Sequence, residues 1–195
     1  MKILVLSDIH YPFTDRIRLA AIINEEKPDR TIFLGDNVSD ETHAKEFLRF
    51  ISETGCHDYV LIKGDNDIAL TYEKELEMNI DGRSFKFVHG YQFSVGGEQT
   101  TARIASVLKK VHERLPVLAY AIFSKAKSRS NGYLILGHSH ALAFFPRLRV
   151  ACAGCLTTEK NIYNDRGYVV ISSGEGSGVM LNIKRLDHRD ATFEI

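Results

Sequence analysis

The chain has 195 residues, of which 44% are hydrophobic and 26% are charged. This balance is typical of a globular protein with its own core and excludes an intrinsically disordered chain. Lysine and arginine number 25 together, as do aspartate and glutamate, so the net charge is zero. Overall charge is therefore excluded as the force that attracts nucleic acid or an anionic membrane, although a local basic patch is not.

The three cysteines are too few, and odd in number, for the disulfide framework of a small secreted protein. Their number indicates a reducing compartment. The first apolar run, residues 3–6, is shorter than the core of a secretory signal and is followed at once by Ser7 and Asp8. No apolar run in the sequence is long enough to span a bilayer. We therefore expect a cytoplasmic protein with no membrane partner.

The first third of the sequence alternates between strand and helix patterns. Short apolar runs at residues 2–6, 30–34 and 59–62 are typical of strands that are covered on both faces. Helical spacing of apolar residues lies between them, at residues 17–24 before Pro28 and at residues 44–51 before Gly55. The order β-α-β-α-β predicts an α/β sheet.

The rest of the sequence has a different pattern from that of the first third. Residues 76–80 and 83–88 flank Asp81-Gly82, a strong hairpin signal. Residues 101–127 have helical spacing, with Pro116 suited to the first turn of a second helix. Further strands are expected at residues 133–136, 149–153, 167–171, 179–184 and 191–195. Because we expect these late strands to be antiparallel, the whole predicts a four-layer α/β/β/α sandwich of two mixed sheets. We expect one domain over residues 1–195, with residues 97–130 as an inserted helical hairpin.

Metal-ligating residue types follow five of the predicted strands. They are Asp8 and His10, then Asp36, then Asp65, then His89, and finally His138 and His140. The carboxyl ends of strands form the ligand-binding edge of an open α/β sheet. Each piece alone has a simpler interpretation, since Gly-Asp-Asn is a common turn and a lone histidine often belongs to the core. Their repeated placement at strand ends predicts one shared metal site.

In this order the motifs resemble the calcineurin-like metallophosphoesterase superfamily, and most of all its small prokaryotic phosphodiesterase branch. The resemblance implies that Asp8, His10 and His140 hold one metal ion and that Asp65, His89 and His138 hold a second. Asp36 would bridge the two. It also implies hydrolysis of a phosphoester, preferably a phosphodiester, by a hydroxide that bridges the metals.

Mixed imidazole and carboxylate ligands suit transition metals better than Mg or Ca. We expect two divalent ions, Mn first, with Ni, Co, Fe or Zn as alternatives. The substrate would be a small phosphoester or a nucleotide-like molecule. A phosphomonoesterase, a nuclease and an inactive metal-binding scaffold of the same fold are the alternatives, although zero net charge speaks against tight nucleic-acid binding.

Two positions depart from the family pattern. Asp65 stands where the family has Asn, so a third carboxylate would hold metal more tightly and attract an anionic substrate less. The alternative is that the loop shifts by one residue and Asn66 is the ligand. Many relatives have a His at position 66, which can protonate the leaving group, whereas an amide cannot. Good leaving groups should therefore be favoured.

The remaining expectations concern substrate and surfaces. We expect Asn66 and Asp67 to act in catalysis and Asn37 and Asn66 to bind the substrate phosphate, although Asn37 could equally only shape a turn. The cations of the insertion are either a solvated helix face or an anion-collecting surface. The apolar run at residues 117–123 could pack against a second copy of the chain. Cys152 and Cys155 are interpreted as buried strand residues rather than a thiol pair.

Overall fold

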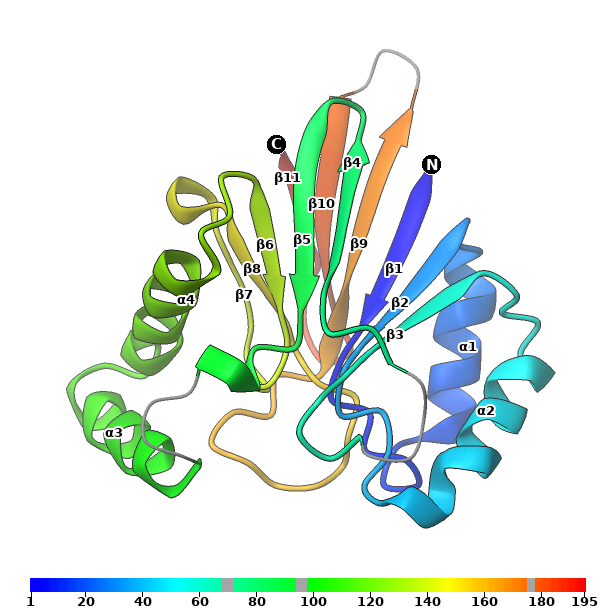
Figure 1. Ribbon diagram of the computed structural model, residues 1–195, viewed down its shortest axis with the longest axis horizontal. Coiled ribbons are helices and arrows are strands. Elements are labelled where there is room, and N and C mark those ends of the chain that lie inside the picture. Colours follow the sequence, from blue (N-terminus) through cyan, green and yellow to red (C-terminus); the bar gives the residue numbers. More distant parts are fainter. Residues whose placement is uncertain (68–71, 94–97, 175–177) are drawn as a thin grey trace.

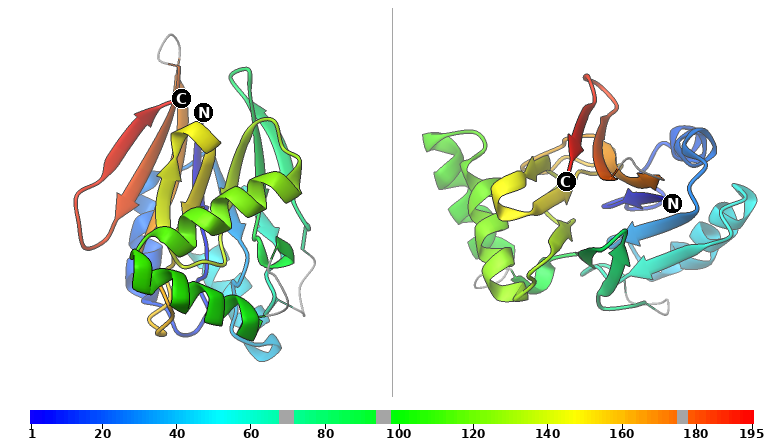
Figure 2. Two further views of the ribbon diagram at one scale, coloured as in Figure 1. Left: turned by 90° about the vertical axis from the view of Figure 1, so that its left-hand side faces the viewer. Right: turned by 90° about the horizontal axis from the view of Figure 1, so that it is seen from above.

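The computed structural model in Figure 1 describes residues 1–67, 72–93, 98–174 and 178–195. Two sheets face each other at its centre, and helices cover the outer side of each (Figures 1 and 2). The predicted four-layer α/β/β/α sandwich of two mixed sheets is therefore confirmed. Among the described residues, no helix has both the length and the apolar character needed to cross a membrane.

The first sheet has six strands. In spatial order they are β11 (Ala191–Glu194), β10 (Gly178–Arg185), β9 (Gly167–Gly174), β1 (Lys2–Leu6), β2 (Arg30–Leu34) and β3 (Tyr59–Ile62). β1, β2 and β3 are parallel, so their carboxyl ends lie at the same edge. β9 joins β1 antiparallel, and β10 and β11 continue as antiparallel hairpins. The three early strands begin and end at the predicted residues.

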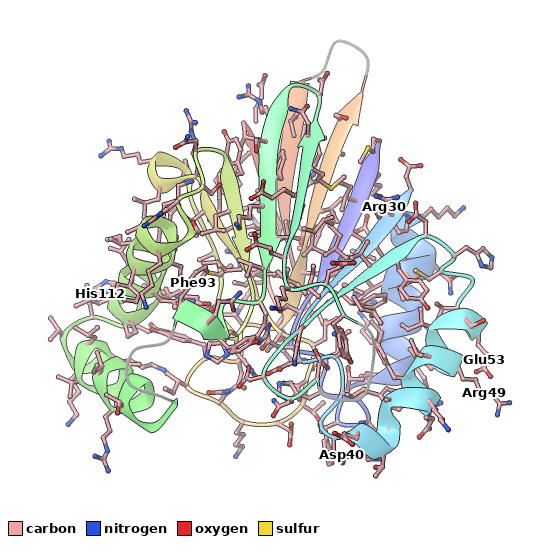
Figure 3. The ribbon with its side chains drawn as sticks, in the orientation of Figure 1. Arg30, Asp40, Arg49, Glu53, Phe93 and His112 are labelled. Atoms are coloured by element: carbon pink, nitrogen blue, oxygen red, sulfur yellow. The ribbon has the colours of Figure 1, made fainter. Side chains whose placement is uncertain are left out.

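Two helices cover the outer face of this sheet: α1 (Arg16–Glu26) and α2 (Ala44–Glu53), the latter preceded by the short η1 (Glu41–His43). Asp15 caps α1 by accepting from the main-chain nitrogen of Arg18 at 3.0 Å. The inner side of α2 buries Phe47 and Ile51 against the sheet. Its outer side carries an exposed ion pair between Arg49 and Glu53, which point away from the molecule in Figure 3.

The second sheet has five strands. In spatial order they are β4 (Leu76–Ile80), β5 (Arg83–Val88), β6 (Tyr133–Leu136), β8 (Val150–Ala153) and β7 (Leu142–Phe145). Its outer face is covered by α3 (Glu98–Val111) and α4 (Leu115–Ser128), which pack side by side (Figure 2). Pro116 lies in the first turn of α4, as predicted. Of the predicted insertion, residue 97 lies outside the described residues. Two short helical turns, η2 (Tyr91–Phe93) and η3 (Pro146–Leu148), complete the chain.

The expectation that all late strands are antiparallel is wrong. β6 is parallel to both β5 and β8, because the α3–α4 hairpin carries the chain back to the end where β5 began. β7 was not expected. Arg149 was expected in β8, but its φ of 54° places it in a left-handed turn just before that strand.

The main core lies between the two sheets and includes Val5, Ile32, Phe87 and Ile135, all fully buried. Burying each such side chain contributes about 1.5–3 kcal/mol. This packing fixes the sheets with the carboxyl ends of β1, β2, β3, β5 and β6 at one end of the sandwich, the lower end in Figure 1. Both chain termini lie at the other end.

Candidate metal centre

The structure brings together all seven residues that the sequence marks as metal ligands. Their ligand atoms form two groups, in each of which all atoms lie within 4.8 Å of one another. The first group is Asp8, His10 and His140; the second is Asp36, Asp65, His89 and His138. β1, β2, β3, β5 and β6 each contribute at least one of these residues, directly after the strand ends.

In the first group, His140 Nε2 lies 3.2 Å from Asp8 Oδ1. The rings of His10 and His140 face each other with centroids 5.4 Å apart. His10 Nε2 also lies 3.7 Å from Asp36 Oδ2. The first group therefore adjoins a carboxylate of the second.

In the second group, the Oδ1 atom of Asp65 lies 3.3 Å from His89 Nε2 and 3.3 Å from His138 Nδ1. His89 Nε2 is also 3.5 Å from Asp36 Oδ2. Asp36 thus approaches imidazoles of both groups with one oxygen. That is the position a bridging carboxylate needs.

The backbone at these residues is bent in an uncommon way. Five of the seven have positive φ, between 49° and 61°: Asp8, His10, Asp36, His138 and His140. Aspartate and histidine tolerate this left-handed region better than most residues, but it costs about 1–3 kcal/mol each. Such strain concentrates at functional sites, because the turn aims a side chain that a relaxed strand would point elsewhere.

Two glycines permit the close approach of the loops. A Cβ atom on Gly35 would lie 2.4 Å from the ring of His89, and one on Gly64 would lie 2.1 Å from Asp36 Oδ1. Real Cβ atoms do not come this close to other heavy atoms, so any larger residue would push the ligands apart. A glycine directly before Asp36 and before Asp65 is therefore required by packing.

Asp8 and His89 use the atoms on the far side of their side chains for hydrogen bonds. Asp8 Oδ2 accepts from the Ser7 hydroxyl and from the main-chain nitrogen of His138. His89 Nδ1 donates to the main-chain oxygen of Leu34 at 2.7 Å. Within the described part of the chain, the buried atoms Asp8 Oδ1, His10 Nε2 and His89 Nε2 have no hydrogen-bond partner. Buried donors and acceptors are rarely left so, and metal ions bound by the two ligand groups would satisfy all three.

The charges of the centre shift its pKa values strongly. Burial alone would raise the pKa of Asp8, but the imidazoles of His140 and His89 hold it well below its usual range. The same competition lowers the pKa of Asp65, where His138 and His89 outweigh burial. Burial alone would lower the pKa of His89, but nearby carboxylates, Asp36 foremost, raise it well above its usual value. The imidazole of His89 and the carboxylates of Asp8 and Asp65 thus stabilise each other's charged forms.

The three remaining predicted residues lie beside the second group, in the loops after β2 and β3, which are joined by hydrogen bonds. Asn66 donates to both oxygens of Asp36, from its main-chain and side-chain nitrogens at 3.1 and 3.0 Å. Asp67 is fully buried and accepts from Gly64, Asn37 and Val38. Burial raises the pKa of Asp67.

Asn37 is also fully buried, and its side-chain nitrogen donates to Ile62 O and to Asp67 Oδ2. These contacts favour the interpretation that Asn37 shapes the turn after β2.

Sequence reasoning missed two residues that reach the centre from the loop between β8 and β9. Glu159 Oε2 lies 3.5 Å from His10 Nδ1, and Asn161 Nδ2 lies 3.3 Å from His140 Nε2. The only signal in the sequence is a run of polar residues from Thr157 to Asn161, which is typical of any loop. The positions of Glu159 and Asn161 beside the ligand histidines depend on tertiary structure.

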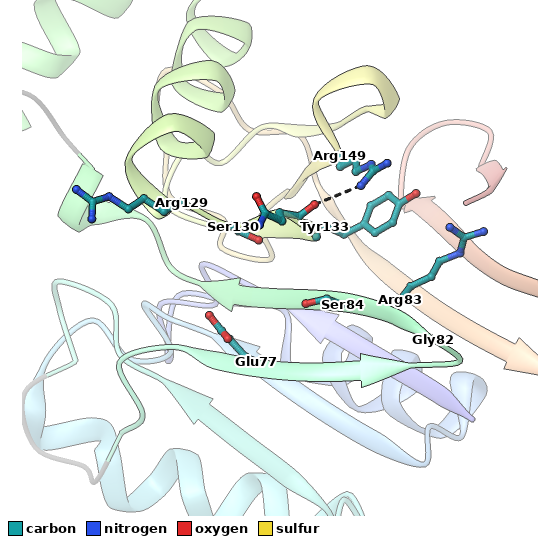
Figure 4. A pocket seen from close by; sticks show the side chains of 10 residues that line it. Glu77, Gly82, Arg83, Ser84, Arg129, Ser130, Tyr133 and Arg149 are labelled. Atoms are coloured by element: carbon teal, nitrogen blue, oxygen red, sulfur yellow. Dashed lines mark hydrogen bonds between the residues drawn. The ribbon is translucent and has the colours of Figure 1, made fainter.

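The three cysteines and one described pocket contribute no residue to the two ligand groups. Cys56, Cys152 and Cys155 are buried and free, and burial raises the pKa of both Cys152 and Cys155 to about 12. A pocket of about 450 Å³ opens at the opposite ends of β5 and β6, where Arg83 and Arg149 flank Tyr133 (Figure 4). It contains none of the predicted site residues.

Comparison with known proteins finds a matching family model. The model of the calcineurin-like phosphoesterase superfamily domain matches residues 1–175. No curated protein matches the chain.

Several solved structures share the fold. The zinc complex of Vps29 from Entamoeba histolytica has a TM-score of 0.64 at 15% identity, covering 100% of this chain and 98% of that one. YfcE, a phosphoesterase from E. coli, has a TM-score of 0.59 at 16% identity, with 100% of both chains covered. An archaeal phosphodiesterase has a TM-score of 0.56 at 17% identity, covering 99% of this chain and 100% of that one.

Proposed function

The chain belongs to the calcineurin-like phosphoesterase superfamily, and on this premise we propose that it is a metal-dependent phosphodiesterase. The observation that carries the proposal is the pair of ligand groups that share Asp36 between them. A scaffold of the same fold that binds no metal would need neither a full set of ligands nor the five residues of positive φ that aim them.

Two divalent ions fit the donor set. Asp8, His10 and His140 would hold the first, Asp65, His89 and His138 the second, and Asp36 would bridge them. Two such ions, when bound, activate a water molecule at neutral pH and stabilise the oxygens of an in-line phosphoryl transfer. Four imidazoles and three carboxylates favour Mn, with Ni, Co, Fe or Zn as alternatives, over Mg or Ca.

The assignment of Asp65 rather than Asn66 as a ligand rests on what each side chain contacts. Asp65 Oδ1 lies within 3.3 Å of two ligand imidazoles. Asn66 instead donates from its side-chain nitrogen to Asp36. Asn66 would therefore orient the bridging carboxylate, and its neutral amide cannot donate a proton to the leaving group.

A small phosphodiester is the proposed substrate. Two of the structural neighbours are a phosphoesterase and a phosphodiesterase, which supports this class of reaction. With no acid at position 66, esters with good leaving groups are favoured. We also place the protein in the cytoplasm, since its three cysteines are free and buried.

The test is a metal titration with chromogenic esters. Metal-free protein would be loaded with Mn, Ni, Co, Zn or Mg and assayed on bis(p-nitrophenyl) phosphate and on p-nitrophenyl phosphate. The proposal expects two ions per chain and faster turnover of the diester. Inertness towards both esters with two ions bound would establish the scaffold instead, and faster turnover of the monoester would make the protein a phosphomonoesterase.

A further inference from the structure

The loop between β8 and β9 lies against the chain segment that carries Asp8 and His10 of the first ligand group. The main-chain nitrogens of Leu156 and Thr157 both donate to Asp8 O, at 3.1 and 3.0 Å. The nitrogen of Thr158 donates to Phe13 O at 2.7 Å. These bonds hold the start of the loop beside Asp8 and place Glu159 against His10.

The amide of Asn161 has a defined orientation in this loop. Its Oδ1 accepts from the main-chain nitrogen of Ile162 at 2.7 Å, so the oxygen is already used. The main-chain nitrogen and oxygen of Asn161 are bonded in turn to the side chain of Asn164. Asn161 therefore presents Nδ2, a donor, towards His140 Nε2 at 3.3 Å.

The far end of the loop is tied to the turn between α3 and α4. The Tyr163 hydroxyl donates to Glu113 O, and Lys109 Nζ donates to Ile162 O at 2.7 Å. Arg114 forms an ion pair with Asp165. With both ends fixed, Asn161 is held in place before any ligand arrives, so little conformational entropy would be lost on binding.

We infer that Asn161 donates a hydrogen bond from Nδ2 to a phosphate oxygen of the bound substrate, an inference that rests on the proposed function. His140 Nε2 points to Asp8 and would bind an ion of the first group. The lone pair of His140 Nε2 would then no longer be available to accept from Asn161 Nδ2. A carboxamide nitrogen has no lone pair for a cation but donates readily to a phosphate oxygen. Asn161 is thus a substrate-positioning residue beside the first metal group.

The test compares two asparagines with the same local role. Asn79 also uses Oδ1 to accept a main-chain nitrogen, that of Gly82 at 2.8 Å, but it lies on the exposed β4–β5 hairpin. Asn161→Ala and Asn79→Ala therefore remove equivalent local bonds. Binding of inorganic phosphate to the Mn-loaded proteins would be measured by calorimetry, together with metal content and the KM for bis(p-nitrophenyl) phosphate.

We expect Asn161→Ala to weaken phosphate binding and raise KM by about tenfold, the effect of one hydrogen bond to a charged group. Metal content should stay at the wild-type value, and Asn79→Ala should behave as wild type. Asn161→Asp should weaken phosphate binding further, because its carboxylate repels the anion. The inference is overturned if Asn161→Ala binds phosphate as Asn79→Ala does, or if it loses metal. A wild-type protein that binds metal but neither phosphate nor ester would overturn the proposed function itself, and this inference with it.

Discussion

The imidazole of His89, which follows β5 of the second sheet, is bonded through Nδ1 to the main-chain oxygen of Leu34, the last residue of β2 in the first sheet. The contact joins the two sheets at the metal-ligating edge. It also fixes the tautomer, so that Nε2 faces Asp36 and Asp65. A residue expected to bind metal is therefore also part of the link between the two sheets.

Replacing His89 should affect both metal content and stability. In His89→Ala we expect the metal content to fall from two ions to one, as measured by elemental analysis after dialysis. The metal-free variant should lose about 3 kcal/mol in urea unfolding, because buried carboxylates lose a cationic partner. His188→Ala, at an exposed histidine outside the centre, is the control and should match wild type. A His89→Ala protein that retains two ions would contradict the assignment.

Metal binding should depend steeply on pH. In the metal-free protein the pKa values of His89 and His140 lie above their usual 6.5. Both must lose a proton to bind a cation, so apparent metal affinity should rise with pH until both are neutral. We expect proton release on Mn binding, measured by calorimetry in buffers of different ionisation enthalpy. Affinity that is independent of pH between about 6 and 8 would contradict this.

The same shifts predict how the metal-free protein responds to pH. A histidine whose pKa is raised on folding stabilises the fold fully below 6.5 and loses this contribution as pH rises through the folded value. The lowered pKa of Asp8 and Asp65 acts in the opposite sense, since their contribution is lost as pH falls below their usual value of 3.8. Thermal unfolding in a chelator should therefore show lower Tm at alkaline pH, and added Mn should restore it.

Asp65→Asn should show whether Asp65 or Asn66 is the metal ligand. If Asp65 is a ligand, the variant raises the formal charge of two ions and their carboxylates from +1 to +2. We expect metal to dissociate at least about tenfold faster and KM for an anionic diester to fall, since ligand charge affects both at short range. Dissociation is measured by transfer of Mn to a chelator. If Asn66 is the ligand, the rate should not change, and Asn66→Ala should lose metal instead.

Much of this centre could be predicted because its residues follow short, apolar strands that are easy to recognise. Asp8, Asp36 and Asp65 each come a few residues after such a run, and parallel strands bring their carboxyl ends to one edge. The fold was harder to predict where the hydrophobic pattern of a strand does not determine its direction in the sheet. Nothing in residues 133–136 distinguishes a strand parallel to β5 from an antiparallel one, because the direction is set by the α3–α4 hairpin.

Contacts made by loops could not be predicted from the sequence, because they too depend on tertiary structure. Asn161 reaches His140 only because the loop is fixed at both ends by bonds to residues distant in sequence, such as Asp8 and Glu113. Asn37 shows the reverse case. Its position directly after Asp36 fitted either a substrate contact or a role in shaping the turn, and its amide nitrogen donates inwards to Asp67. A motif reveals which side chains are close to the centre but not where each hydrogen bond goes.

The absence of an acid at position 66 predicts how rate depends on the leaving group. Asn66 donates to Asp36 and cannot supply a proton, so the departing oxygen must carry more negative charge in the transition state. Across a series of aryl phosphodiesters we expect kcat to fall steeply as the leaving-group pKa rises. Asn66→His, which introduces a group that can be protonated near neutral pH, should flatten this dependence and speed the poorest leaving groups most. Asn66→Ala is the matched control, since it removes the amide without adding an acid, and its plot should remain steep. A flat wild-type plot would mean that another group on the protein already protonates the leaving oxygen.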